Sequence, residues 1–287
     1  MRIMTDKKIL GALRCPICRA PMHMRTEGSN SLVCAGARIH CYDLSSSGYV
    51  NLCPPSQSGG GDSKQAVRAR SEFLNKGFYE AVAVEVAGMC EKWGNKEMML
   101  VDAGCGEGYY TSFVCKKGFS AFGVDISKFA ADAASKRLSK EIDNGFFFAT
   151  ASVFELPVAD CSAGIITNIF APCEEREFSR VLDNDGILIV AHAGENHLMG
   201  LKKSIYSKAY ANSERADLPA YMTKLDESRV SFNITLTDNA QIMSLFAMTP
   251  YYWRTSPEDA EKLSAINELS TEVDIIISVY KNEKDKI

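Results

Sequence analysis

Three cysteines and a histidine near the start of the chain have the types and spacing of a metal site. Cys15 and Cys18 enclose a Pro-Ile pair, and Cys34 and His40 follow after fifteen intervening residues. Thiolate and imidazole are the ligands that tetrahedral zinc prefers, and a Cys-x2-Cys pair supplies two of them from one tight turn. Four protein ligands leave no position for water, so the predicted zinc is structural. Cys41 adjoins His40 and is a rival fourth ligand, although we favour His40.

A glycine-rich segment that begins at Asp102 predicts a second site. Gly104, Gly106 and Gly108 follow an apolar run as Asp-Ala-Gly-Cys-Gly-Glu-Gly. Dinucleotide-binding turns have the spacing Gly-x-Gly-x-x-Gly instead, and a carboxylate directly before the turn would repel a pyrophosphate. The same carboxylate suits a ligand with an ammonium and a sulfonium group. We therefore predict S-adenosylmethionine, with Asp102 orienting its amino group and the glycines admitting its methionyl part.

Two later residues fall where the rest of this ligand would lie. Asp125 ends the next apolar run, 23 residues after Asp102, where its carboxylate can accept both ribose hydroxyls. Ser152 follows the third apolar run, at the expected edge of the adenine. Together with the glycine turn, these residues predict a methyl donor site.

Strands and helices that alternate along the chain must position these residues. We predict strands at 98–101, 119–124, 146–148, 163–167 and 187–191, with helices that begin near Tyr109, Ser127 and Glu174. This order is typical of a parallel sheet with helices on both faces. The fold class is therefore α/β, a Rossmann-like class I methyltransferase fold with an N-terminal zinc ribbon.

Three further elements flank this core. A single long helix is predicted from Ser63 to Trp93, ahead of the first strand. Residues 229–236 and 271–280 read as an antiparallel pair of strands at the sheet edge, with a helix capped by Asp238 between them. These elements complete the predicted methyltransferase fold.

Composition suggests the domain boundaries. Residues 1–53 hold the zinc ligands, 54–63 form a linker rich in proline, serine and glycine, and 64–287 form the methyltransferase domain. The net charge is −4, but the first 50 residues carry seven basic and three acidic side chains, a charge of +4. This basic head could attract phosphates or simply be a solvated surface. The sequence has no long apolar run, so we expect a cytoplasmic protein without membrane contact.

Nearly the whole chain resembles the bacterial 23S ribosomal RNA guanine-N1 methyltransferases, which modify a stem-loop of the large subunit and whose Gram-positive branch is linked to macrolide resistance. Besides the two motifs above, the resemblance rests on several segments: Gly48-Tyr-Val-Asn-Leu52, Gly61-Asp62, Ala69-Arg-x-x-Phe-Leu-x-x-Gly-x-Tyr79, Phe170-Ala-Pro-Cys173, His197-Leu-Met and Met248-Thr-Pro250.

The resemblance implies methylation at guanine N1 in a 23S rRNA stem-loop by a homodimer. It implies zinc at the four ligands above and methyl donor contacts at Tyr79, Gly106, Glu107 and His197. The chain departs from the family pattern in the ribbon, where two extra residues separate Cys34 from His40, so Cys41 stays a rival ligand.

The segment after the fourth predicted strand suggests how the base is held. Enzymes that methylate exocyclic amines carry Asn/Asp-Pro-Pro-aromatic there, whereas this chain has Asn168-Ile-Phe-Ala-Pro. A ring-nitrogen target fits that departure. As a hypothesis, Phe170 stacks on the extruded base, and Asn168 or a backbone group touches its edge. The sequence identifies no general base.

Two other function classes remain to be weighed. One is a small-molecule methyltransferase with an incidental finger, which the basic head argues against. The other is an inactive zinc-ribbon RNA-binding protein, which the intact Asp102, Gly106 and Asp125 argue against.

Overall fold

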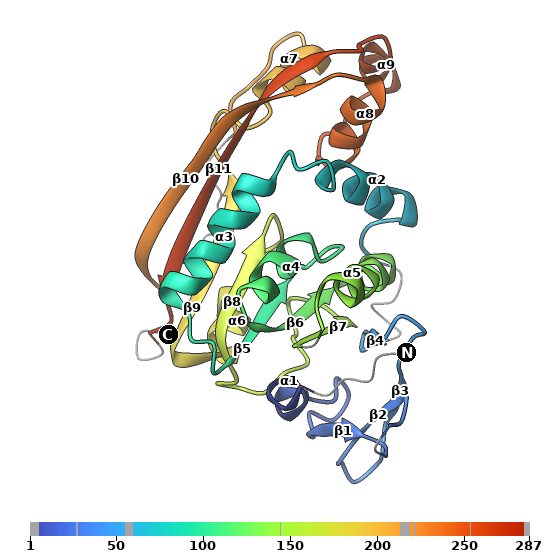
Figure 1. The fold of residues 1–287 in the computed structure, drawn as a ribbon, viewed down its shortest axis with the longest axis vertical. Coiled ribbons are helices and arrows are strands. Elements are labelled where there is room, and N and C mark those ends of the chain that lie inside the picture. Colours follow the sequence, from blue (N-terminus) through green and yellow to red (C-terminus); the bar gives the residue numbers. More distant parts are fainter. Residues whose placement is uncertain are drawn as a thin grey trace.

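A twisted sheet of eight strands forms the centre of the computed structural model (Figure 1). The structure describes residues 6–26, 28–54, 60–143, 145–212, 219–220, 222–252 and 254–283. The strand order is β10-β11-β9-β8-β5-β6-β7-β4. The bounds of these strands are β4 Val50–Asn51, β5 Met99–Ala103, β6 Ser120–Asp125, β7 Phe146–Thr150, β8 Ala163–Ile169, β9 Leu182–Ala193, β10 Thr223–Leu236 and β11 Leu269–Lys281.

The sheet is parallel from β4 to β9, and β11 runs antiparallel to both β9 and β10. The predicted α/β sheet and its antiparallel edge pair are therefore confirmed. All parallel strands end at the same edge, which brings the loops after β5, β6, β7 and β8 together. In Figure 1 the last two strands extend beyond the others, toward α7 (Met199–Ile205), α8 (Asn239–Ala247) and α9 (Pro257–Ser264).

Helices cover both faces of the sheet because successive strand residues point to opposite sides. Leu100 and Ala121 belong to the hydrophobic cluster that contains α3 (Glu80–Trp93), α4 (Tyr109–Lys116) and α5 (Lys128–Glu141). Their neighbours Val101 and Phe122 belong to the cluster of the opposite face, with α1 (Lys7–Ala12) and α6 (Glu175–Val181). Among the described residues, no helix is long and apolar enough to cross a membrane.

The helical segment before β5 is two helices, so the prediction of one long helix was wrong. α2 spans Lys64–Leu74, with Ser63 as its N-cap, and α3 begins at Glu80. Gly77 lies between them at a φ of +83°, in the left-handed region that glycine favours and that a helix cannot continue through. The break places Tyr79 at the N-terminus of α3.

The zinc-binding segment folds as a small antiparallel sheet of β1 (Met22–Met24), β2 (Ser31–Cys34) and β3 (Cys41–Asp43). Its core is continuous with that of the main domain, because Leu13 and Leu32 lie in the same hydrophobic cluster as Phe122. β4 pairs in parallel with β7 at the edge of the main sheet. The described residues between 6 and 53 thus pack on the methyltransferase sheet and also supply one of its strands.

The predicted linker 54–63 is described only in part, since 55–59 lie outside the described residues. Gly61 packs so closely on the turn after β6 that an added Cβ would lie 2.7 Å from Ile126. The Ser127 hydroxyl donates a hydrogen bond to the carbonyl of Asp62 at 2.7 Å. The end of the linker therefore lies against the carboxyl edge of the sheet.

Candidate functional site: a Cys3His cluster and a cofactor cradle

The four predicted zinc ligands converge. The ligand atoms of Cys15, Cys18, Cys34 and His40 all lie within 4.8 Å of one another. The Sγ atoms of Cys18 and Cys34 are 3.6 Å apart, and His40 Nδ1 lies 3.5 Å from Cys15 Sγ and 3.4 Å from Cys34 Sγ. A tetrahedral zinc with ordinary Zn–S and Zn–N bonds spaces its ligand atoms about 3.5–3.8 Å apart. The donor set and its spacing fit zinc.

The surroundings of the cluster favour His40 over Cys41 as the fourth ligand. Cys41 is exposed at the start of β3 and is not part of the converging group. The His40 backbone N–H donates to Cys34 Sγ at 3.1 Å. Burial alone would raise the pKa of the Cys34 thiol. Hydrogen bonds from His40 and Gly36 outweigh this effect and lower the pKa to about 6. These donors favour the thiolate, which is the form that binds zinc.

Asp102 lies at the carboxyl end of β5 and is almost fully buried. One oxygen accepts a hydrogen bond from the Thr111 hydroxyl of α4, and the other accepts one from the Thr167 hydroxyl of β8 at 2.9 Å. Burial raises the Asp102 pKa to about 6, against the effect of both donors. Asp102 therefore joins β5, α4 and β8, through two threonines that were not predicted from the sequence. Its expected contact with the amino group of the cofactor stays a prediction.

The glycine turn is shaped by close backbone contacts. Gly104 has a φ of +87°, and a Cβ added to it would lie 2.3 Å from the Ala171 Cβ of the loop after β8. The Gly106 N–H donates to one oxygen of Asp125 at 3.0 Å, and the Ser127 N–H donates to the other at 2.8 Å. Burial raises the Asp125 pKa. Asp125 thus lies where β6 ends, joined to the glycine turn, with lone pairs left for further donors.

Two buried polar atoms at this edge have no hydrogen-bond partner among the described residues. They are Oε1 of Glu107 and the hydroxyl oxygen of Thr150, at the end of β7. The other Glu107 oxygen lies 3.8 Å from an Arg70 nitrogen, and Arg70 also pairs with Asp62. Burial raises the Glu107 pKa more than Arg70 lowers it. Unpaired buried polar atoms are costly, so this edge fits a polar ligand that pairs with them.

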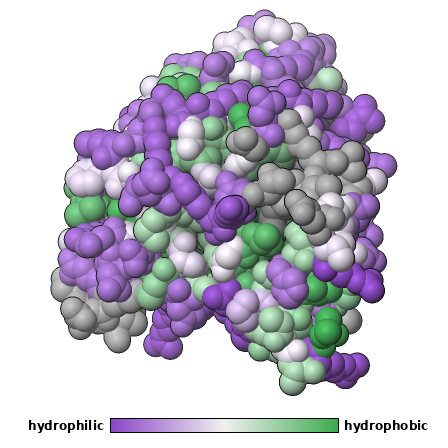
Figure 2. All heavy atoms as spheres, turned by 60° about the horizontal axis from the view of Figure 1, so that its bottom comes forward, coloured by the Kyte–Doolittle hydropathy of each residue, from purple (hydrophilic) through white to green (hydrophobic). Residues whose placement is uncertain are grey.

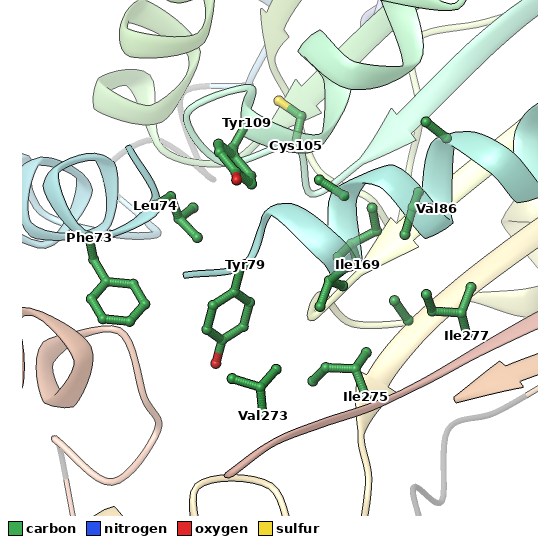
Figure 3. Close-up of a cluster of buried hydrophobic side chains, with 14 of the residues drawn as sticks. Phe73, Leu74, Tyr79, Val86, Cys105, Tyr109, Ile169, Val273, Ile275 and Ile277 are labelled. Carbon is green, nitrogen blue, oxygen red and sulfur yellow. The ribbon is translucent and has the colours of Figure 1, made fainter. Parts of the chain in front are cut away.

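We call the group of Asp102, Gly104, Gly106, Glu107 and Asp125 the cofactor cradle. Tyr79 and His197 contact one another beside it. His197 Nε2 lies 3.3 Å from the Tyr79 hydroxyl oxygen, and its Nδ1 accepts a hydrogen bond from the Asp274 N–H at 3.2 Å. Burial lowers the His197 pKa to about 4, so the ring is neutral near pH 7. Because Nδ1 is an acceptor, the neutral ring carries its proton on Nε2, and Nε2–H donates a hydrogen bond to the Tyr79 hydroxyl oxygen. In Figure 3 the Tyr79 ring points from the start of α3 toward Val273 of β11.

Phe170 is the exposed aromatic residue of this site. It directly follows β8, is 45% exposed, and has a φ of +53°, which non-glycine residues rarely adopt. Its ring centroid lies 6.3–6.5 Å from those of His197, Tyr79 and Tyr110. Tyr110 was not a predicted site residue. A strained aromatic residue that the structure holds partly open to solvent suggests a role in contacting a ligand.

Asn168 lies near the end of β8. Its side chain is fully buried in β8, and the amide nitrogen donates to the carbonyls of Ala103 at 3.2 Å and Pro172 at 2.9 Å. A buried amide needs such partners, and here both are backbone groups of the surrounding loops. The expected contact of this side chain, or of a backbone group, with the target base stays a prediction. Asn168 instead joins the turn after β5 to the loop after β8.

Ser152 lies in the loop after β7, as predicted. Its hydroxyl accepts a hydrogen bond from the Phe154 N–H at 3.2 Å. The loop begins beside Asp125, because the Ala151 N–H donates to the Asp125 carbonyl at 3.0 Å. The expected contact of Ser152 with adenine stays a prediction.

Comparisons with known proteins agree with both halves of the site. Residues 101–190 match the family model described as "Methyltransferase domain", and residues 13–58 match the zinc-ribbon model described as "RlmA, N-terminal". The solved structure of the YcgJ protein from Bacillus subtilis is 15% identical, covers 70% of this chain and 99% of its own, and has a TM-score of 0.48.

Two curated relatives span nearly the entire chain. YxjB of Bacillus subtilis (strain 168), whose name reads "Putative 23S rRNA (guanine-N(1)-)-methyltransferase YxjB", is 30% identical over 93% of this chain and 96% of its own length. The 23S rRNA (guanine(748)-N(1))-methyltransferase of Streptomyces fradiae is 27% identical over the same shares. The zinc cluster, the glycine turn and these full-length matches agree, and the chain therefore belongs to the family of 23S rRNA (guanine-N1)-methyltransferases.

Proposed function

We propose that this protein transfers a methyl group from S-adenosylmethionine to N1 of a guanine in a stem-loop of 23S rRNA. The observation that carries the proposal is the position of Phe170, half-exposed and strained at the end of β8, against the Tyr79–His197 pair. An aromatic ring held there can stack on a base that has left its helix. The names of the full-length relatives support the substrate.

The residues of the cradle divide the work of holding the cofactor. When bound, S-adenosylmethionine supplies an electrophilic methyl group on a sulfonium sulfur. The backbone of Gly104 and Gly106, which carries no side chain, would lie against the methionyl part, and Asp125 would accept the ribose hydroxyls with its remaining lone pairs. Glu107 offers its unpaired oxygen to the ligand. Asp102 joins β5, α4 and β8, and we assign to it the orientation of the cofactor's amino group.

The target nitrogen must lose its proton as the methyl group arrives, because guanine N1 is an amide-like N–H. His197 is a poor acceptor for that proton, since its Nδ1 already accepts the Asp274 N–H and its Nε2 is already protonated. We assign His197 and Tyr79 to orientation of the cofactor and Phe170 to the base. The proton passes to a group outside this pair.

The zinc ribbon and the assembly complete the proposal. The charge of +4 in the first 50 residues would attract the RNA backbone, which gives the ribbon a part in holding the stem-loop. Figure 2 brings the ribbon's end of the molecule forward and shows apolar residues between the hydrophilic ones that cover most of that face. The exposed Ile17 and Ile39 belong to this ribbon. A homodimer acting in the cytoplasm is part of the proposal, as the family resemblance implies.

Methyl transfer to RNA can be tested directly. The purified protein is incubated with labelled S-adenosylmethionine and either deproteinised 23S rRNA, from a strain lacking the enzyme, or a metabolite extract. Since N1-methylguanine blocks Watson–Crick pairing, primer extension on the product RNA should stop at a guanine in a loop. Label in the metabolite extract without any new stop on the RNA would contradict the proposal.

A further inference from the structure

Among its contacts with the main domain, the zinc ribbon forms a group of hydrogen bonds with one short turn, Leu156–Val158, in the loop that follows β7. The Arg14 N–H donates to the Pro157 carbonyl at 2.8 Å, and Leu13 forms an isolated antiparallel bridge with Val158. Just beyond the turn, the Ala159 N–H donates to the Ala12 carbonyl, also at 2.8 Å. The ribbon therefore continues the backbone hydrogen bonding of this turn.

The Arg19 side chain donates hydrogen bonds to the same turn. Its two terminal nitrogens lie 3.1 Å from the carbonyl oxygen of Leu156 and 3.2 Å from that of Val158. Arg19 directly follows the zinc ligand Cys18, has a φ of +58°, and donates its backbone N–H to the Cys15 carbonyl. The turn from Cys15 to Cys18, here called the zinc knuckle, thus sets the direction in which the Arg19 side chain leaves the ribbon.

A second arginine, in the main domain, also donates hydrogen bonds to this turn. Arg180 of α6 donates to the carbonyls of Leu156 at 3.2 Å and Val158 at 3.0 Å, the same two acceptors that Arg19 uses. Arg180 also pairs with Glu177 and Asp160. The Leu156–Val158 turn therefore lies between two guanidinium groups, one from the ribbon and one from α6.

This turn closes the loop on which the adenine of the cofactor is predicted to lie. The loop starts at Ala151, whose N–H donates to the Asp125 carbonyl, and continues through Ser152 and the buried Val153. It reaches the Leu156–Val158 turn three residues later. Movement of the turn would therefore displace the wall beside the adenine.

We propose that Arg19 is a positioning residue for cofactor binding, through which the zinc-bound knuckle holds the adenine side of the cradle. This inference rests on the proposed function, because it requires S-adenosylmethionine in that cradle. It gives the ribbon a second role besides contact with RNA. It also means that the Arg19 charge is engaged with the protein's own carbonyls.

The test measures binding of S-adenosylhomocysteine to the full-length, zinc-loaded protein by calorimetry, together with zinc content. Arg19→Ala should retain its zinc and bind the ligand about five- to tenfold more weakly, which is the effect expected from losing charged hydrogen bonds at a partly exposed site. Arg19→Lys, which keeps one donor, should fall between it and wild type. In turnover assays, the KM for S-adenosylmethionine should rise while kcat stays near wild type.

Arg38→Ala is the matched control, since Arg38 is an exposed arginine of the same ribbon, and its ligand affinity should equal that of wild type. If Arg19→Ala loses zinc, Arg19→Lys and Arg180→Ala are compared with wild type at equal zinc occupancy. The Arg19→Ala/Arg180→Ala double variant should deviate from additivity by more than about twofold, because both side chains hold one turn.

Equal affinity of zinc-loaded wild type and Arg19→Ala would overturn this inference and leave the proposed function intact. Strictly additive effects of the two arginine substitutions would also contradict it. Failure of the wild-type protein to bind S-adenosylhomocysteine would instead overturn the proposed function, and this inference with it.

Discussion

His197 Nε2 lies 3.3 Å from the hydroxyl oxygen of Tyr79, although the two residues are 118 positions apart in the sequence. The Asp274 N–H holds the other ring nitrogen, so His197 is a fixed neutral donor. Its ring is also nearly parallel to that of Phe170, at an angle of 14° and a centroid distance of 6.3 Å. Tyr79 and His197 therefore connect α3 and the loop after β9 to Phe170, which is proposed to stack on the base.

Tyr79→Phe should weaken cofactor binding and lower stability. The substitution leaves the buried Nε2–H of His197 without its acceptor, which costs about 1–3 kcal/mol. Urea unfolding at pH 7.5 measures the stability loss, and the KM for S-adenosylmethionine measures the binding loss. His197→Ala and the double variant close a mutant cycle. Additive losses in that cycle would show that the two side chains do not act as a pair.

Phe170→Ala should reduce RNA methylation by about 10–100-fold, because stacking on an aromatic ring stabilises an unpaired base by about 1–3 kcal/mol. Affinity for S-adenosylhomocysteine should stay within about twofold of wild type. Phe170→Gly should behave in the same way and also relieve the backbone strain at a φ of +53°. Phe129→Ala, at an exposed phenylalanine of α5, is the control. Full activity of Phe170→Ala would exclude the stacking role.

His40→Ala should lose zinc, whereas Cys41→Ser should keep one zinc per chain, because only His40 lies in the converging group. The ribbon shares a hydrophobic cluster with the main sheet, so zinc loss should lower the unfolding temperature of the whole protein. Metal analysis and a thermal unfolding curve on each variant measure both effects. Zinc release by Cys41→Ser would reverse the assignment of the fourth ligand.

The stabilising contribution of Asp102 should fall as pH rises from about 4 to 6. Its folded pKa is about 6 and its ordinary value 3.8, so the folded state holds the proton more tightly. Below pH 4 both states are protonated and no cost arises; above pH 6 both are ionised, and the folded state is disfavoured by on the order of 3 kcal/mol.

Asp102→Asn removes this titration and is the reference. Urea unfolding of the two proteins between pH 4 and 8 should give a stability difference that moves against wild type up to about pH 6 and then levels off. A difference independent of pH would show that burial does not raise the Asp102 pKa.

Gly104→Ala should destabilise the protein and impair cofactor binding, because the new Cβ would lie 2.3 Å from Ala171 Cβ. Gly118→Ala is the matched control: its φ of +90° is similar, but apart from its chain neighbours no atom of the described residues lies within 4 Å of its Cβ position. The control should lose about 1 kcal/mol from backbone strain alone. Gly104→Ala should lose clearly more, together with affinity for S-adenosylhomocysteine. Equal losses in the two variants would argue against the close contact.

Local patterns in the sequence were sufficient for the approximate positions of β5 to β11, for the Cys3His cluster and for the glycine turn, but not for β1 to β4. The Cys-x2-Cys pair and the Gly-x-Gly-x-Gly segment encode tight turns within a few residues, and alternating apolar runs report strand burial directly. Asp125 could be placed because parallel strands bring their carboxyl ends to one edge.

Contacts between distant segments were decided only by the tertiary structure. The turn at Gly77 that aims Tyr79 at His197, the two threonines on Asp102, and the inward amide of Asn168 all join elements that are far apart in the chain or depend on side-chain direction. Arg19 reaches carbonyls 137 and 139 residues away. Such contacts depend on how whole elements pack, because a side chain finds its partner only once both elements have docked. The sequence by itself therefore determined which chemistry this protein carries, and the packing of its elements decided which residues hold that chemistry in place.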